Sequence, residues 1–321
     1  MSGRAAERDR VAQGGGAPQD DARAVRWHTH GWNRGLSWRL IHGIIPCVPR
    51  PLRPPIHLAT TLLCFGAMPR ERRAARRNLG RITGRGGLAS HLMSFRLFYN
   101  FSKFMVGYTD LRPFRPERVE RRVEGREEGR RTIERLLAEG KGLIVITLHL
   151  GNWEIGLALL ARLGRPVSVV LRPEEAEGPA RFEAEARAHP GVRTVTAGDS
   201  AWNGLDLLLA LRRGEIVAIQ GDRPFGPVTG RTTLFGAPLD LPTGPLRLAQ
   251  ASGAPVLLVC CALRGHSRYR FHLERPLRVG PGEDAARAAL RDLAGGIERI
   301  VRRYPTQWFN FYDMWGTAGR F

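Results

Sequence analysis

The chain has 321 residues, which is long enough for one large α/β domain or two small ones with a sizeable buried core. Hydrophobic residues make up 43% of it, which excludes a chain that is disordered throughout. A formal net charge of +20 and an isoelectric point near 11.3 exclude a charge-balanced surface and indicate an acidic partner: a nucleic acid, an anionic membrane surface or an acidic carrier protein.

The N-terminal part is predicted to be a disordered tail followed by short apolar segments. Residues 1–26 are rich in Gly, Arg, Asp and Ala and lack the apolar region of a secretory signal peptide. The apolar runs Leu36–Val48 and Ile56–Met68 are each shorter than the roughly 18 residues of a membrane span, and prolines separate them. Tryptophans mixed with arginines over 26–39 are typical of a membrane interface. Two interpretations stay open: an interfacial or re-entrant helix pair, and two helices that pack on the domain.

Two further helices are predicted before the main domain. The stretch Met68–Leu79 is helix-compatible and densely positive; its arginines are Arg70, Arg72, Arg73, Arg76 and Arg77. Beside a membrane each would contribute about 1 kcal/mol of binding to anionic lipid, whereas the alternative is a solvated helix face. Leu88–Tyr108 is predicted as a helix whose phenylalanines share an apolar surface.

From residue 119 onward, helices and strands alternate. Val119–Gly140 is predicted as an amphipathic helix, with further helices over 154–163, 178–189 and 200–213. The predicted strands are Gly142–Leu148, Pro166–Leu171, Val192–Thr196, Glu215–Gln220, Pro255–Leu263 and Arg270–Glu274. This alternation predicts an α/β fold with a largely parallel central sheet flanked by helices. Ligands of such sheets bind at the carboxyl ends of the strands.

The turn His149–Trp153, which joins the first strand of the sheet to a helix, carries the strongest candidate site. Because the chain reverses there, the side chains of His149 and Glu154 can meet, which they could not do on one continuous helix. One imidazole nitrogen would bond the carboxylate, and the other would act as a general base. The start of the helix, capped by Asn152, would stabilise negative charge. A histidine that only hydrogen-bonds the helix end is the structural alternative.

Polar residues also follow two other predicted strands. Arg172 follows the second strand, and Gly221–Arg223 follows the fourth. If those strands are parallel to the first, both groups lie at the sheet edge that carries His149. A guanidinium group there suits a phosphate. An ion pair between Arg172 and Asp222 that ties two strand ends together is the alternative.

The cysteines indicate a reducing compartment and no metal site. The chain has four of them without a C-x2-C pair, and Cys260 and Cys261 are adjacent in an apolar strand, where they cannot easily bridge. No H-E-x-x-H motif is present, so we expect no zinc and no other cofactor.

Five sequence blocks resemble one known family. HLGNWE fits the H-x4-D/E motif (here HX4E) of the lysophospholipid acyltransferase superfamily, and THLGNWE resembles its branch of lipid A biosynthesis (lauroyl/myristoyl type) acyltransferases. The second block of that branch ends a strand with arginine, as VVLRP does, and the third carries an acidic residue after a strand, as GDRPFGP does. A fourth is similar to LFGAPLDLPTGPLRLAQASGAPVLL, and YPTQWFNFYDMWG resembles the ending of the branch.

The resemblance implies a membrane-associated acyltransferase in which His149 takes the proton of an acceptor hydroxyl and Glu154 orients its imidazole. Asp222 would organise the site. The residues to which the resemblance gives substrate-binding roles are Asn152, Arg172, Asp222, Arg223, Thr243 and Gly244. The segment Phe95–Phe104 and Phe235 are candidates for the wall of an acyl-chain channel, with core packing as the alternative.

The same resemblance implies substrates, partners and a location. The donor would be acyl carrier protein or acyl-CoA, and the acceptor a lipid A-like glycolipid, with a phosphatidylinositol mannoside or a lysolipid as alternatives. The location would be the cytoplasmic face of the bacterial inner membrane, on anionic lipid. The implied organisation is a tail over 1–26, an interfacial helical segment over 27–86 and an acyltransferase domain over 87–321.

Two other classes of function are compatible with parts of the sequence. A nucleic-acid-binding protein would explain the charge, although the arginines are spread over the chain and no binding motif is present, so we expect no nucleic acid. A thioesterase or other hydrolase would use the same histidine and carboxylate on water.

Overall fold

The centre of the protein is a seven-stranded sheet with the strand order β1-β9-β8-β2-β5-β3-β4. It is seen in a computed structural model that describes residues 48–49, 52–109, 120–171, 191–196, 201–224, 228–265 and 268–316. Strands β8, β2, β5, β3 and β4 are parallel, β9 runs antiparallel to β8, and β1 is parallel to β9. The strands of this sheet are β1 (Val123–Glu124), β2 (Leu143–Thr147), β3 (Val167–Leu171), β4 (Val192–Thr196), β5 (Ile216–Gln220), β8 (Val256–Arg264) and β9 (Arg268–Leu273).

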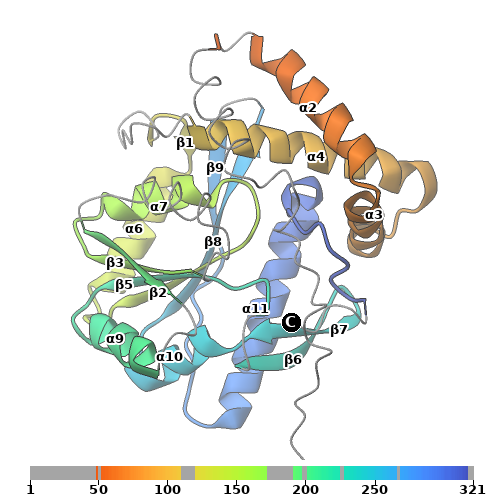
Figure 1. Ribbon diagram of the computed structural model, residues 1–321. Helices are drawn as coiled ribbons and strands as arrows, with labels where there is room; N and C mark the ends of the chain where they lie inside the picture. The colour runs from red at the N-terminus through yellow and green to blue at the C-terminus, as the bar shows by residue number, and fades with distance from the viewer. Residues whose placement is uncertain are drawn as a thin grey trace, which may run out of the picture.

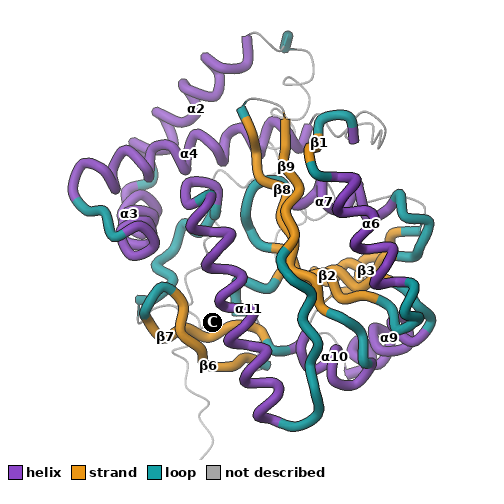
Figure 2. Tube along the Cα trace, turned by 180° about the vertical axis from the view of Figure 1, so that it is seen from behind, coloured by secondary structure: helices purple, strands orange, loops and turns teal. Residues whose placement is uncertain are grey.

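Helices cover both faces of this sheet (Figures 1 and 2). Successive side chains of a strand point to opposite faces, so Ile144 and Ile146 of β2 pack on one side and Leu143 and Val145 on the other. The helices on the isoleucine side are α9 (Ala201–Arg212), α10 (Gly244–Ser252) and α11 (Glu283–Arg303). Those on the opposite side are α6 (Arg126–Leu137) and α7 (Trp153–Ala161). Burial of both faces explains why β2 is a continuous apolar run. The predicted α/β fold with a largely parallel, helix-flanked sheet is therefore confirmed.

The predicted elements match the observed ones closely, with one helix too long. The predicted strand Val192–Thr196 coincides with β4, and each of the other predicted strands overlaps an observed one. The helix expected over 119–140 begins only at Arg126, because Val123–Glu124 forms β1 against β9 and Gly125 turns the chain with a φ of 75°. The helix predicted over 178–189 lies outside the described residues.

A hairpin and a long helix are among the observed elements that were not predicted. The first is an antiparallel hairpin of β6 (Thr229–Leu234) and β7 (Ala237–Pro242), separate from the main sheet. Its two-residue turn, Phe235 and Gly236, has φ values of 51° and 73°, as a type I′ turn requires. The second is the 21-residue helix α11, whose buried residues are Ala289, Leu290, Leu293, Ala294, Gly296, Ile297, Ile300 and Val301.

In the described part of the chain, helices α2 (Arg53–Ala67), α3 (Pro69–Thr83) and α4 (Gly87–Thr109) precede the sheet and pack together at one end of the molecule (Figures 1 and 2). Helix α4 confirms the helix predicted over 88–108. Within the described ranges, none of the helices is both long enough and apolar enough to span a membrane. The predicted tail and the tryptophan-rich stretch over 27–38 lie outside those ranges, as does nearly all of the apolar run 36–48.

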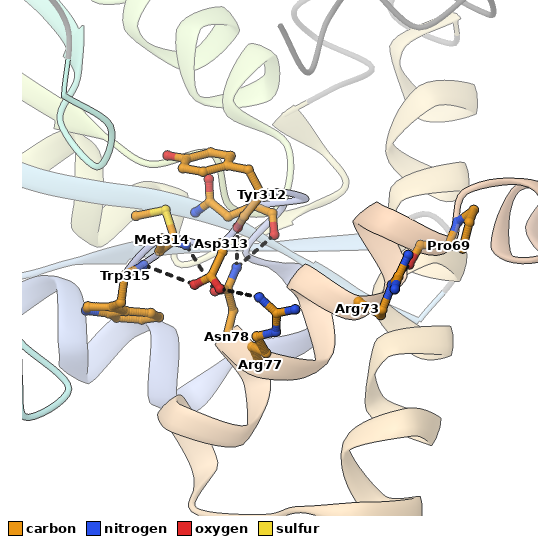
Figure 3. Close-up of polar contacts among 9 residues, drawn as sticks. Pro69, Arg73, Arg77, Asn78, Tyr312, Asp313, Met314 and Trp315 are labelled. Carbon is orange, nitrogen blue, oxygen red and sulfur yellow. Dashed lines mark hydrogen bonds and ion pairs between the residues drawn. The ribbon is translucent and has the colours of Figure 1, made fainter. Parts of the chain in front are cut away.

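Helix α3 is joined to the C-terminal end of the chain by the side chain of Asn78 (Figure 3). The amide nitrogen of Asn78 donates to the carbonyl oxygens of Asn310 and Tyr312 at 3.1 and 2.8 Å, and its amide oxygen accepts from the backbone N–H of Met314 at 3.2 Å. Beside it, Arg77 forms an ion pair with Asp313 at 2.8 Å. These contacts hold the segment that follows α11 in one path across the molecule.

Candidate active site

The turn after β2 is held by backbone hydrogen bonds from three other parts of the chain. The N–H of His149 donates to Oδ2 of Asp222 at 3.1 Å, and its carbonyl accepts from the N–H of Phe309 at 2.8 Å. The N–H of Gly151 donates to the carbonyl of Gln307 at 3.0 Å. The N–H of Asn152 donates to the carbonyl of Cys261, on β8, at 2.8 Å. The position of the His149 ring is therefore fixed by long-range contacts as well as by the local turn.

Gly151 is required by the close approach of this turn to β8. Its φ is +66°, and a Cβ atom at this position would lie 2.1 Å from the carbonyl oxygen of Cys261. A real Cβ cannot occupy that space, so a larger residue would push the turn away from the sheet.

Helix α7 begins directly after this turn, and Asn152 caps it as predicted. The side-chain oxygen of Asn152 accepts from the N–H of Ile155 at 3.3 Å. Glu154 lies in the first turn of the helix and is only 5% exposed. A carboxylate in this position interacts favourably with the positive end of the helix dipole.

A carboxylate from a different strand meets the imidazole ring. Nδ1 of His149 lies 2.7 Å from Oδ1 of Asp222, which follows β5. The Asp222 side chain is completely buried, whereas 17% of the His149 side chain is accessible. Because β2 and β5 are adjacent and parallel, their carboxyl ends bring these two residues together. Asp222 thus makes, from the neighbouring strand, the kind of orienting contact that was predicted for Glu154.

Asp222 is ionised although it is buried. Burial alone would raise its pKa, but the charge and hydrogen bond of His149, the charge of Arg223 and the hydrogen bond of Trp308 together lower this pKa from 3.8 to about 2. An ionised carboxylate can only accept hydrogen bonds, so the hydrogen of this contact lies on Nδ1 of His149. The lone pair of the neutral ring is then on Nε2, the nitrogen that a general base would use.

Trp308 is a member of this site that was not predicted. Its indole nitrogen donates to Oδ2 of Asp222 at 2.7 Å, and the residue is 1% exposed. No local pattern signals the contact, because the two residues are 86 positions apart and meet only where the C-terminal segment crosses the carboxyl edge of the sheet.

Arg223 is directed at the C-terminal segment. Its Nε donates to the side-chain oxygen of Asn310 at 2.7 Å, and a terminal nitrogen donates to the carbonyl of Phe309 at 2.6 Å. The guanidinium carbon also lies 5.7 Å from the centre of the Tyr312 ring. Arg223 is buried, so the contacts described for it support the fold around Asp222.

The remaining residues with predicted binding roles are Arg172, Thr243 and Gly244. Arg172 is outside the described residues. Thr243 and Gly244 stand where β7 passes into α10, and the N–H of Thr243 donates to the carbonyl of Val228 at 3.1 Å. Since α10 leads back to the start of β8, which is parallel to β2, its N-terminal end lies on the carboxyl-edge side of the sheet.

Aromatic rings continue from His149 into the N-terminal helices. The centre of the Trp153 ring is 5.5 Å from that of His149 and 4.3 Å from that of Phe104 on α4. Further ring contacts link Phe104, Phe101, Phe98 and Phe65 with Phe309 and Phe311. Phe235 lies elsewhere, in the hairpin turn, against Trp308 and Trp315. The packing interpretation therefore applies to Phe235, and the α4 phenylalanines form a core next to the site.

A family model described as bacterial lipid A biosynthesis acyltransferase matches residues 30–317, which include every candidate site residue. The chain belongs to this family. The match confirms the family assigned from the sequence blocks and extends it over most of the N-terminal part.

Two curated relatives are similar to part of the chain. They are phosphatidylinositol mannoside acyltransferases of Mycobacterium tuberculosis, from strains CDC 1551 / Oshkosh and ATCC 25618 / H37Rv. Each is 25% identical over 185 residues, which is 57% of this chain and 57% of the relative. The chain thus spans little more than half the length of these relatives.

Proposed function

We propose that this member of the family is an O-acyltransferase that moves a fatty acyl chain from a carrier thioester to a hydroxyl group of a glycolipid. The observation that carries the proposal is the 2.7 Å contact between Asp222 and Nδ1 of His149 at the carboxyl edge of the parallel sheet. This contact leaves the basic lone pair on Nε2 of a partly accessible ring.

His149 acts as the general base. Its Nε2 takes the proton of the acceptor hydroxyl while the oxygen bonds to the carbonyl carbon of the thioester. The tetrahedral intermediate then collapses, the carbon–sulfur bond breaks, and the protonated Nε2 returns its proton to the departing thiolate. The products are one ester and one free thiol, with no net change in protons. Proton transfer of this kind contributes about 10²- to 10⁴-fold to the rate.

The ionised Asp222 stabilises the imidazolium that forms during the reaction and keeps the ring in one tautomer. Glu154 supplies a second carboxylate in the same turn, and the family motif pairs it with His149. The start of α7, which Asn152 caps, would stabilise the oxyanion of the intermediate through the positive end of its helix dipole. Arg172 binds a phosphate of the donor or of the acceptor.

The donor is the acyl carrier protein or acyl-CoA, with the carrier protein favoured by charge. The net charge of +20 would steer a strongly acidic carrier protein to the site. The acceptor is a lipid A-like glycolipid, as the family name suggests. A phosphatidylinositol mannoside is a second candidate, which the names of the two relatives favour.

The function is tested by supplying purified protein with either acyl donor and a total bacterial lipid extract, and identifying new acylated lipids by mass spectrometry. We expect a new acyl ester on a sugar-containing lipid, and its loss in His149→Ala. His91→Ala is the matched control, because this histidine packs against Phe65 in the N-terminal helices. Free fatty acid without acylated lipid would identify a thioesterase and refute the proposal. Full transfer by His149→Ala would refute the role of the base.

We also propose that the N-terminal part holds the protein on the anionic cytoplasmic face of the inner membrane. Support comes from exposed leucines at the N-cap of α2, on α2 itself and on the start of α4: Leu52, Leu58, Leu62, Leu63, Leu88 and Leu92, which are 46–72% exposed. Exposed apolar groups of this kind favour a bilayer, and the arginines of α3 would add attraction to anionic headgroups.

Vesicle sedimentation tests this location with two matched double variants. Leu58 and Leu62 are 46% and 57% exposed, and Leu205 and Leu209 on α9 are 42% and 40% exposed at the same spacing. Leu58→Ser with Leu62→Ser should weaken binding to anionic vesicles, and Leu205→Ser with Leu209→Ser should not. Equal binding by both double variants would contradict the assignment of α2 to the interface.

A further inference from the structure

The segment that follows α11 has no part in the chemistry proposed above, yet it makes some of the closest contacts to the site. It comprises the short 3₁₀ helix η5 (Pro305–Gln307) and the residues Trp308 and Phe309. The side chain of Gln307 clamps the backbone of Leu263 on β8, accepting from its N–H at 2.7 Å and donating to its carbonyl at 2.9 Å. Gln307 is thereby fixed against β8, and the next residue, Trp308, directs its indole nitrogen to Asp222.

The two oxygens of Asp222 have different partners. Oδ1 faces Nδ1 of His149, and Oδ2 accepts both the backbone N–H of His149 at 3.1 Å and the indole N–H of Trp308 at 2.7 Å. An aspartate side chain rotates about its Cβ–Cγ bond at little cost unless both oxygens are engaged. The rigid indole, together with the backbone N–H of His149, therefore fixes the direction in which Oδ1 faces.

The Trp308 ring is itself held in place. Its centre lies 6.4 Å from that of Trp315 and 6.2 Å from that of Phe235, and the residue belongs to the core beneath the sheet. A buried, packed indole loses no further rotamer freedom when it donates to Asp222, so its hydrogen bond is pre-organised.

We propose that Trp308 is a positioning residue, which holds Asp222 so that Oδ1 meets His149 and sets the basicity of that histidine. The inference rests on the proposed function for its effect on the rate, but its effect on the His149 ring exists without any substrate. Trp308 acts only through Asp222 and does not touch the reacting atoms.

The charged groups around this contact determine the direction of the effect. Asp222 faces His149 and Arg223, and Glu154 lies in the first turn of α7. The indole N–H withdraws part of the negative charge of Asp222. Removing that donor makes the carboxylate a stronger base and a stronger partner for protonated His149, so the pKa of the His149 ring rises.

Trp308→Phe tests the proposal, because it removes the N–H and keeps an aromatic ring. We expect kcat to fall by about 10- to 100-fold with little change in KM, as for loss of a hydrogen bond to a charged group. The acid limb of the pH profile of kcat/KM should move to higher pH. The matched control is Trp315→Phe, which removes a buried indole nitrogen that makes no hydrogen bond in the described structure. Because phenylalanine keeps an aromatic ring next to Trp308, the rate and the pH profile of this variant should stay close to those of the parent.

A double-mutant cycle separates positioning from general damage to the fold. In a background of Asp222→Asn, the change Trp308→Phe should have almost no further effect on kcat, because both act through one contact. Multiplying effects, or an unshifted profile, would refute positioning and leave Trp308 as a core residue.

An NMR titration of the His149 ring, assigned with His149→Ala, requires no activity. We expect the pKa of this ring to be higher in Trp308→Phe than in the parent. An unchanged pKa would overturn the inference even in an active enzyme. A shifted pKa in a protein without acyl transfer would keep the inference and refute the proposed function.

Discussion

Replacing Asp222 with asparagine is the sharpest test of the site, because it preserves size and removes charge. Three N–H groups point at this carboxylate: the ring and the backbone of His149 and the indole of Trp308. Asparagine offers one oxygen and one NH₂ group, so at least one of these donors would face another donor. If the NH₂ group turns toward the ring, Nδ1 must accept and the hydrogen moves to Nε2, which can then no longer act as a base.

The size of the effect follows from the pKa of Asp222 and from the tautomer. Lowering this pKa from 3.8 to about 2 stabilises the folded protein by about 2 kcal/mol at neutral pH. Since the folded-state pKa lies below the unfolded one, this contribution is complete above pH 3.8 and is lost as the pH falls toward 2. We expect Asp222→Asn to reduce kcat by about 10²- to 10⁴-fold, as for loss of a correctly oriented general base.

The assay is acyl transfer at neutral pH, together with thermal unfolding over the acid range. Asp240→Asn is the matched control, because Asp240 pairs with Arg231 across the β6–β7 hairpin at 3.0 Å and its side chain is 41% exposed. An exposed pair of this kind contributes about 0–1 kcal/mol, so the control should remain active and nearly as stable. A folded Asp222→Asn protein that transfers acyl groups at the parental rate would refute the argument that the His149 tautomer depends on Asp222.

Three further predictions concern the turn that carries His149. Gly151→Ala should lower the melting temperature far more than Gly164→Ala does. Both glycines have a φ of +66°, but only a Cβ atom at position 151 would meet the carbonyl oxygen of Cys261. Equal decreases in melting temperature would contradict this reasoning. In denaturant titrations, Asn152→Ala should lower the free energy of unfolding by about 1 kcal/mol, and Asn152→Ser should lower it by less because serine still caps α7. Identical decreases in the two variants would argue against the cap. Glu154→Ala should abolish acyl transfer while circular dichroism stays unchanged, and retained transfer would remove Glu154 from the site.

The sheet could be predicted because its strands carry their own signal. Residues such as Ile144 and Val145 are buried whichever face they point to, so the strand must be apolar throughout, and that run is visible without knowledge of any neighbour. The hairpin of β6 and β7 lacks such a signal, since Thr, Gly and Arg fill β6. Its turn also lacks the usual sequence signal, because Phe235 adopts a positive φ at a position where Asn or Asp is usual. Helix α11, in contrast, has apolar residues at helical spacing and could have been predicted from the sequence.

The site could be predicted only as far as its local and topological parts. The turn, the cap at Asn152 and the shared sheet edge of His149 and Asp222 follow from strand and helix patterns combined with the rule for parallel sheets. Spacing along the chain points only to Glu154, because Asp222 lies 73 positions from His149 and reaches Nδ1 from the neighbouring strand. The contact with Trp308 depends on the path of a segment that comes after the whole sheet, and nothing local records that path.

The position of His149 therefore depends on distant residues as much as on its own motif. The turn is fixed by the carbonyl of Cys261 from β8, by Gln307 and Phe309 from the C-terminal segment, and by Asp222 from the end of β5. Each contact is made with backbone atoms or with a buried carboxylate whose two oxygens are both engaged, so none can adjust by a simple change of rotamer. A catalytic ring that must hold one tautomer and one direction needs such rigid support. For this reason substitutions in the C-terminal segment, which touches no substrate in the proposed reaction, should change the rate while leaving substrate binding nearly intact.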